Sequence, residues 1–278
     1  MFTLFGEYLL GRSDSVWVGS LIALLEPFGL TEGGVRAALS RMAKKDWLSS
    51  ERRGKSSFYA LTDRGRALLE EGQQRIYHPS WDQAWSGDWL VLAYSIPENA
   101  RSLRDRLRDR LAWLGFGSMG NGLWISPRDV EQDVRALSAS LNLHDHLMCF
   151  KARPATDLSD DELVRRCWDL KALHRSYTDF AQRWRRESYT AGAPTPAAKD
   201  ESDVRAFVLR FELIHEFRRF PLEDPFLPRA LLPKPWGGDD ATDVFRDLHD
   251  RLMGPADKWV SKVLRNTPPH IDHSLSVP

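Results

Sequence analysis

The period of the hydrophobic pattern changes twice within the first third of this chain. From Val16 to Met42, apolar residues recur every three or four positions, as they do in amphipathic helices. Around ERRGKS, residues 51–56, two runs have strand character, and Gly54 can adopt the positive φ of a tight turn. The helical period returns at DRGRALLEEGQQR. We therefore expect the order helix, helix, helix, hairpin, helix over residues 1–86.

A second pattern, in which strands alternate with helices, occupies residues 87–155. Three apolar runs, DWLVLAYSIP, GLWISP and DHLMCFKARP, predict strands. Two amphipathic helices are expected between them, and Leu103, Leu107, Leu111 and Leu114 form the buried side of the first. This β-α-β-α-β order predicts a ferredoxin-like central domain with a dimerisation or scaffold role.

The last part of the chain, residues 156–278, is predicted to be mainly helical. One long helix or two shorter ones cover DELVRRCWDLKALHRSYTDFAQRW, and further helices cover VRAFVLRFELIHEFRRF and roughly Ala241–Leu264. A loop is expected at 186–203. The Pro-rich but apolar residues 221–240 predict an ordered connector packed on a surface, and the tail is expected to be mobile from about residue 266. The fold class is α+β.

Positive charge is concentrated between Arg36 and Arg66, although the whole chain has a formal net charge of zero. This segment has nine basic residues against Asp46, Glu51 and Asp63, a balance of plus six. Small side chains on the helix let it approach base edges, and long basic ones reach phosphates or guanine. A helix followed by a basic hairpin is typical of a winged helix-turn-helix. The predicted DNA-binding residues are Thr31, Arg36, Ala37, Ser40, Arg41, Lys44, Arg52, Arg53 and Lys55.

The remaining composition favours an intracellular globular protein. Cys149 and Cys167 are too few for a disulfide framework, lack metal-site spacing, and are interpreted as ordinary thiols in a reducing cytoplasm. No apolar run reaches the roughly 18 residues of a membrane span, and MFTLFGEYLL lacks the basic start of a signal peptide. We expect a cytoplasmic location and no membrane partner.

Several long motifs in this sequence resemble the PaaX family, the repressors of phenylacetate catabolism. They are WVGSLIALLEPFGLTEGGVRAALSRMAKKDWL, RRGKSSFYALTDRG, DWLVLAYSIPE, LGFGSMGNGLWISP and LIHEFRRFPLEDPFLPRALLPKPWGG. The resemblance covers nearly the whole chain. It implies a homodimeric repressor that binds an inverted-repeat operator and is released by an aryl-CoA thioester, phenylacetyl-CoA in the name-giving case. It also implies a central domain similar to the CRISPR adaptation nucleases and no catalytic cofactor.

The alternative is an enzyme, either a metal-dependent nuclease or an enzyme acting on acyl-CoA. The CRISPR nucleases place an acidic residue at the end of their first strand, whereas this strand ends in Ala93–Pro97 without a carboxylate. His144 and His146 are interpreted as turn residues, and the single E-x-x-H pair, Glu212 and His215, lacks the second copy that a diiron site needs. No nucleophile elbow or catalytic triad is present. We therefore predict no metal site and no catalytic residue.

An acyl-CoA effector needs cations for its phosphates and an apolar, aromatic slot for its acyl group. The glycine-rich residues 115–122 predict a tight turn, beside which Trp124 could line such a slot. HEFRRF and LPKPWGG supply further cations and aromatic rings, for which a domain interface is the alternative interpretation. The candidate effector residues are Trp124, His215, Arg218, Arg219, Lys234 and Trp236.

Overall fold

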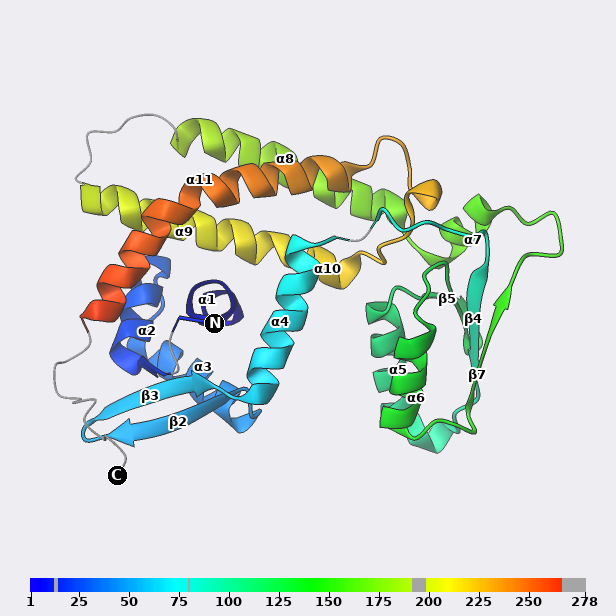
Figure 1. The fold of residues 1–278 in the computed structure, drawn as a ribbon, viewed down its shortest axis with the longest axis horizontal. Coiled ribbons are helices and arrows are strands. Elements are labelled where there is room, and N and C mark those ends of the chain that lie inside the picture. Colours follow the sequence, from blue (N-terminus) through cyan, green and yellow to red (C-terminus); the bar gives the residue numbers. More distant parts are fainter. Residues whose placement is uncertain (13–14, 80, 192–198, 267–278) are drawn as a thin grey trace, which may run out of the picture. The chain divides into compact units, whose positions relative to one another are not determined.

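The computed structural model describes residues 1–12, 15–79, 81–191 and 199–266 (Figure 1). By its internal contacts the chain forms two compact units, and the division falls within helices α8 (Leu170–Ala191) and α11 (Gly237–Arg265). Unit 1 comprises Met1–Tyr77, Gln182–Arg218 and Thr242–Pro278; unit 2 comprises His78–Ala181 and Arg219–Ala241. The predicted boundaries at 86/87 and 155/156 stay predictions, and the tail from residue 267 lies outside the described residues.

Unit 1 begins with the predicted helices and hairpin. Its elements are α1 (Phe2–Leu4), the π-helix η1 (Phe5–Leu9), β1 (Val16–Trp17), α2 (Val18–Leu25), the 3-10 turn η2 (Glu26–Phe28), α3 (Glu32–Lys44), β2 (Leu48–Arg53), β3 (Ser56–Leu61) and α4 (Asp63–Tyr77). The strands form an antiparallel sheet in the order β1-β3-β2. The short strand β1 was not predicted, because two residues are too few to display a period.

The core of unit 1 joins the N-terminal elements to the C-terminal helices α9 (Lys199–Phe217) and α11. Leu4, Tyr8 and Leu39 are fully buried, and they belong to the same hydrophobic cluster as Phe207 of α9 and Val260 of α11. The winged-helix elements therefore do not have a core separate from the C-terminal helices.

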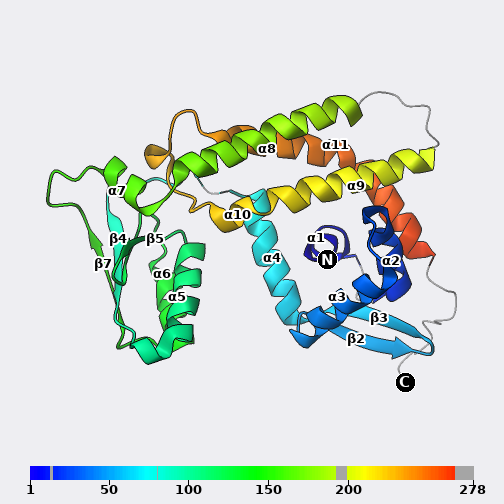
Figure 2. The same ribbon diagram turned by 180° about the vertical axis from the view of Figure 1, so that it is seen from behind.

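Unit 2 contains the predicted ferredoxin-like domain, with one strand more than expected. Its elements are β4 (Trp89–Tyr94), η3 (Glu98–Ala100), α5 (Arg101–Trp113), β5 (Gly117–Gly120), β6 (Leu123–Ser126), α6 (Glu131–Leu141) and β7 (Leu147–Ala152). The antiparallel sheet has the order β5-β6-β4-β7, and α5 and α6 cover one face of it (Figures 1 and 2). The prediction of a simple turn at 115–122 was incomplete, because these residues form β5 as well as the turn at Asn121 and Gly122.

The other elements of unit 2 are α7 (Asp160–Cys167), the first parts of α8 and α11, α10 (Phe220–Glu223) and the 3-10 turn η4 (Arg229–Leu231). The sequence left open whether residues 161–184 form one helix or two. The structure has two helices there, α7 and α8. The Pro-rich connector is ordered as predicted, but much of it is buried in the core and not laid on a surface. Its Asp224 accepts hydrogen bonds from Trp81 Nε1 (3.1 Å), Tyr177 Oη (2.8 Å) and the Phe226 amide (2.6 Å). The loop expected at 186–203 is shorter, because α8 continues to Ala191 and α9 begins at Lys199.

Candidate nucleic-acid interface

Helix α3 has one buried side and one polar, basic side. Thr31 is the N-cap of this helix, and its Oγ1 accepts a hydrogen bond from the Gly34 amide at 3.2 Å. Val35, Leu39 and Met42 are buried. The predicted contact residues lie on the exposed side: Arg36, Ala37, Ser40, Arg41 and Lys44. The helix thus presents two small side chains between long cations, the combination that base-edge contact requires.

The cations of α3 are not equally available to a ligand. Arg36 is paired with Glu32 one turn earlier, with Nε 2.8 Å from the carboxylate. Arg41 and Lys44 are exposed and have no ion-pair partner among the described residues. To contact DNA, Arg36 would have to break its ion pair with Glu32 and bind a base or phosphate in its place. Arg41 and Lys44 have no such pair to break.

The hairpin β2–β3 forms the wing, and it lies beside α3 in both views (Figures 1 and 2). Arg53 pairs with Ser56 in the strand register, and Gly54 closes the turn at a φ of 60°. Arg52 and Lys55 are exposed at this tip. Arg53 turns back, because it bonds Glu51 at 2.7 Å and its guanidinium lies 4.7 Å from the centre of the Phe58 ring. Arg52 Nε donates a 3.3 Å hydrogen bond to the Gly54 carbonyl, but neither Arg52 nor Lys55 has an ion-pair partner among the described residues, so these two are the available cations of the tip.

Apolar side chains hold the base of the wing. Leu48 and Phe58 are buried, while Trp47, Tyr59 and Leu61 are half-buried and pack against the core of unit 1. The start of α4 also contacts the segment that leads into the wing. Thr62 Oγ1 donates a 2.7 Å hydrogen bond to the Asp46 carbonyl, and a Cβ at Gly65 would lie 2.0 Å from the Trp47 carbonyl oxygen.

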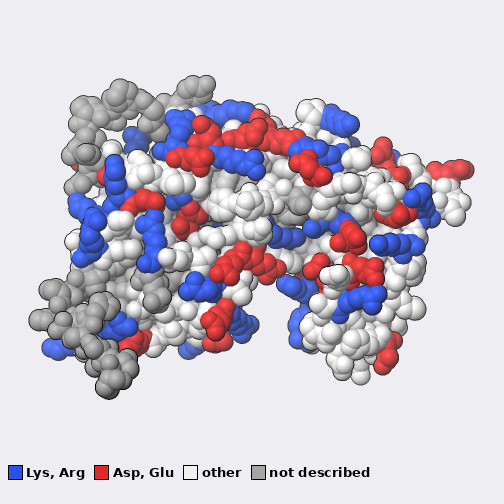
Figure 3. All heavy atoms as spheres, viewed as in Figure 1, with Lys and Arg blue, Asp and Glu red and all other residues white. Residues whose placement is uncertain are grey.

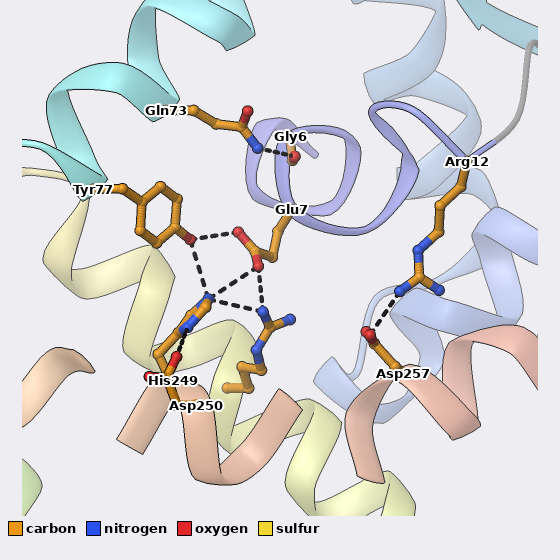
Figure 4. Close-up of polar contacts among 9 residues, drawn as sticks. Gly6, Glu7, Arg12, Gln73, Tyr77, His249, Asp250 and Asp257 are labelled. Atoms are coloured by element: carbon orange, nitrogen blue, oxygen red, sulfur yellow. Dashed lines mark hydrogen bonds and ion pairs between the residues drawn. The ribbon is translucent and has the colours of Figure 1, made fainter. Parts of the chain in front are cut away.

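A buried polar cluster that no sequence pattern indicated connects η1, α4, α9 and α11 within unit 1 (Figure 4). The Glu7 carboxylate receives a hydrogen bond from Tyr77 Oη and forms an ion pair with Arg210. Nε2 of His249 lies 3.1 Å from Glu7 Oε1 and 2.8 Å from Arg210 Nη2. These contacts attach the start of the winged helix to the C-terminal helices by a second route besides the apolar core.

The charges in this cluster follow from its surroundings. Burial opposes the ionisation of Glu7, but the His249 contact, the Arg210 charge and the Tyr77 hydrogen bond together hold its pKa below the ordinary value. Burial and the negative charge of Glu7 raise the pKa of Tyr77, so its phenol stays protonated and donates. The cluster is consequently an ion pair with a neutral phenol donor.

The six candidate effector residues are distributed over both units. Trp124 is buried in the ferredoxin-like core, and Trp236 is buried in a separate aromatic cluster of unit 2 near Tyr177. Arg219 and the exposed Lys234 also belong to unit 2, whereas His215 and Arg218 belong to unit 1. His215 Nδ1 lies 3.2 Å from Thr3 Oγ1, and burial is the main cause of its lowered pKa. Their effector role stays a prediction.

A groove and a smaller cavity lie elsewhere among the described residues. A groove of about 590 Å³ lies between α6 and β7, where Leu90, Val134, Arg135, Cys149 and Lys151 are among the lining residues. A smaller cavity of about 120 Å³ is lined by residues of α8, α9 and α11. None of the six candidate effector residues lines either cavity.

The residues considered for catalysis take ordinary structural positions. His144 and His146 lie in the turn before β7, as predicted, and no group of three or more His, Cys, Asp and Glu residues within the described ranges is placed to hold a metal. Cys149 and Cys167 are free thiols, and burial raises the pKa of Cys167 to about 11. Over the described part of the chain, no helix combines the length and the apolar character needed to cross a membrane.

Known protein families match all three parts of the chain. Three family models match: the PaaX-like protein model at residues 1–65, the PaaX protein central Cas2-like domain at 82–164, and the PaaX-like protein C-terminal domain at 168–262. The Transcriptional repressor PaaX of Escherichia coli (strain K12) is 35% identical over 267 residues, which are 94% of this chain and 81% of the relative.

A solved structure also matches the whole fold. The uncharacterized protein Rv0674 from Mycobacterium tuberculosis aligns with a TM-score of 0.56 at 25% identity, over 94% of this chain and 96% of the other. Since the family models cover the three parts of the chain and the curated relative is a regulator and not an enzyme, this chain belongs to the PaaX family of transcriptional repressors.

Proposed function

We propose that this repressor binds double-stranded DNA through α3 and the β2–β3 wing. Helix α3 would enter the major groove, where Arg36, Ser40 and Arg41 contact base edges, and Arg52 and Lys55 would bind the neighbouring phosphates. The observation that carries the proposal is the exposed basic side of an N-capped α3 next to a hairpin whose tip directs cations outward.

The test is a DNA-shift assay on the promoter region of the protein's own gene. The variant Arg36→Ala/Arg41→Ala/Arg52→Ala should lose the specific complex. The matched control Arg165→Ala/Arg166→Ala, which removes two exposed cations of α7, should retain it. Unchanged operator affinity of the triple variant would contradict the assignment.

We also propose that the repressor is a homodimer on an inverted repeat, with the central sheet in the interface. The face of this sheet opposite α5 and α6 exposes Met148 (68%) and Phe150 (49%), which the strand register places beside Ala93 and Val91. An exposed apolar sheet face is stabilised when another surface covers it. Light scattering should give a dimer for the natural chain and a monomer for Met148→Lys/Phe150→Lys. A dimer that survives both lysines would exclude this face.

The ligand that we propose for release from DNA is an aryl-CoA thioester such as phenylacetyl-CoA, acting on genes for the catabolism of aromatic compounds in the cytoplasm. The support is the family and the cations and aromatic rings in HEFRRF and LPKPWGG. A ligand can release the repressor only if it binds the DNA-free arrangement more tightly. The shift assay is therefore titrated with a panel of aryl-CoA thioesters and free aromatic acids. Failure of every thioester to dissociate the complex would reject this class of effector.

A further inference from the structure

The outer surface of helix α5 carries a dense array of arginines. Five of the ten residues from 101 to 110 are arginine and two are aspartate, so this helical segment has a net charge of plus three in a chain of zero net charge. The buried side of α5 consists of leucines, among which Leu107 and Leu111 are fully buried. The arginines are exposed, except for the half-buried Arg104. Basic side chains are visible along the part of the surface where Figure 1 places α5 (Figure 3).

Most of these guanidinium groups have no counter-charge in the protein. Arg101 lies 3.9 Å from Asp105, at the limit of an ion pair. The guanidinium groups of the other four, Arg104, Arg106, Arg108 and Arg110, make no hydrogen bond or ion pair with any residue that the structure describes. For comparison, Arg135 of the neighbouring helix α6 is paired with Glu131 at 2.7 Å. The arginines of α5 are therefore available for an external anion.

The spacing of these arginines is unfavourable for the isolated helix. Arg104 and Arg108 are four residues apart, and so are Arg106 and Arg110, which brings like charges together on adjacent turns. Asp105 and Asp109 separate the two rows on the helix surface. Asp105 and Asp109 lie three residues from Arg108 and Arg106 and offset part of this repulsion, but each row consists of arginine alone. An external polyanion, by contrast, would relieve the repulsion in both rows.

We infer that α5 is a second DNA-binding surface, which holds phosphates of the duplex in addition to those bound by the wing. The inference rests on the proposed DNA-binding function and extends it to the central domain. Guanidinium groups bind phosphate oxygens through paired N–H donors, and a row of them matches a polymer with regularly repeated charges. Contacts of this kind increase affinity for every sequence alike and do not select bases.

The test measures the salt dependence of DNA binding by the full chain, with fluorescence anisotropy on a duplex of its own promoter region. The variant Arg104→Gln/Arg106→Gln/Arg108→Gln/Arg110→Gln should weaken binding to operator and unrelated DNA equally. It should also reduce the slope of log K against log salt by about 0.9 for each phosphate that the variant no longer binds. The two double variants, 104/108 and 106/110, identify the row that binds the phosphates.

Two comparisons make the result decisive. Arg165→Gln/Arg166→Gln removes two exposed arginines from α7 of the same unit and should leave the slope unchanged. Thermal melts should show no loss of stability in the α5 variants, because glutamine favours helix and removes the like-charge pairs. If the α5 variants keep the natural slope while Arg52→Ala lowers it, the α5 inference is wrong and the winged-helix proposal stands. If neither variant lowers the slope, both proposals fail.

Discussion

The carboxylate of Glu7 and the guanidinium of Arg210 form an ion pair that is almost closed to solvent, with side chains 10% and 3% exposed. The two residues are 203 positions apart in the sequence. Through this pair the first helical segment of the winged helix is attached to α9, and Tyr77 and His249 complete the contacts (Figure 4).

Removal of one residue of the Glu7–Arg210 pair should therefore destabilise the fold strongly. Glu7→Gln leaves the Arg210 charge buried without its carboxylate, and we expect a loss of about 3–5 kcal/mol in the free energy of unfolding. Urea denaturation measures this value. Glu131→Gln, which breaks the exposed pair with Arg135, is the control and should change stability little. Equal small effects of both substitutions would show that the buried pair is not a major stabilising contact.

The same pair predicts a dependence of stability on pH. The folded-state pKa of Glu7 is below its ordinary value of 4.5, so the unfolded chain binds its proton more readily. The stabilisation is fully present above about pH 4.5 and is lost as the pH falls through the folded-state pKa. The difference in unfolding free energy between the natural chain and Glu7→Gln should shrink over this range. A difference that stays constant down to about pH 3 would contradict the lowered pKa.

The position of the wing should depend on a glycine in α4. Gly65→Ala places a Cβ against the Trp47 carbonyl, and the required shift should cost about 1–3 kcal/mol and weaken DNA binding. Gly72→Ala, on the same helix, meets no atom within 4 Å and should stabilise the fold by about 1 kcal/mol. Chemical denaturation and DNA-shift assays compare the two variants. If Gly65→Ala lowers neither stability nor DNA binding, as expected for Gly72→Ala, the close approach of Gly65 to Trp47 does not position the wing.

The N-cap of α3 allows a separate test of how one capping hydrogen bond contributes to stability. Thr31→Ala removes the acceptor for the Gly34 amide and should cost about 1 kcal/mol, whereas Thr31→Ser should retain most of the stability. Unfolding free energies of the two variants provide the comparison. If Thr31→Ser and Thr31→Ala lose the same unfolding free energy, the cap hydrogen bond is not the cause of the loss.

Local patterns in the sequence predicted the elements that carry the DNA interface. Val35, Leu39 and Met42 define the buried side of α3 by their spacing, and Gly54 marks the turn of the wing between two strand-like runs. Strand β5 was missed because Gly117 and Gly120 provide no side chains from which an alternating pattern could be read. The partly buried Pro-rich connector was recognised as ordered, but its depth depends on residues distant in the sequence.

The polar cluster around Glu7 could not be found in this way. Glu7, Tyr77, Arg210 and His249 lie in four separate segments, and no spacing rule connects them. The one local signal was an acidic residue inside the apolar run MFTLFGEYLL, which requires a buried partner if the run packs in a core. The candidate effector residues were chosen from local composition and from their position beside one glycine-rich turn, and neither determines which side chains meet.

The division of roles between α3 and the wing leads to the most direct test of the account. Operator and unrelated DNA are titrated with Arg41→Ala and with Arg52→Ala at matched salt concentrations. Arg41→Ala should weaken operator binding by about 1–3 kcal/mol and leave binding to unrelated DNA nearly unchanged. Arg52→Ala should weaken both alike and reduce the salt dependence. If both variants bind the operator as tightly as the natural chain, α3 and its wing are not the DNA-binding surface.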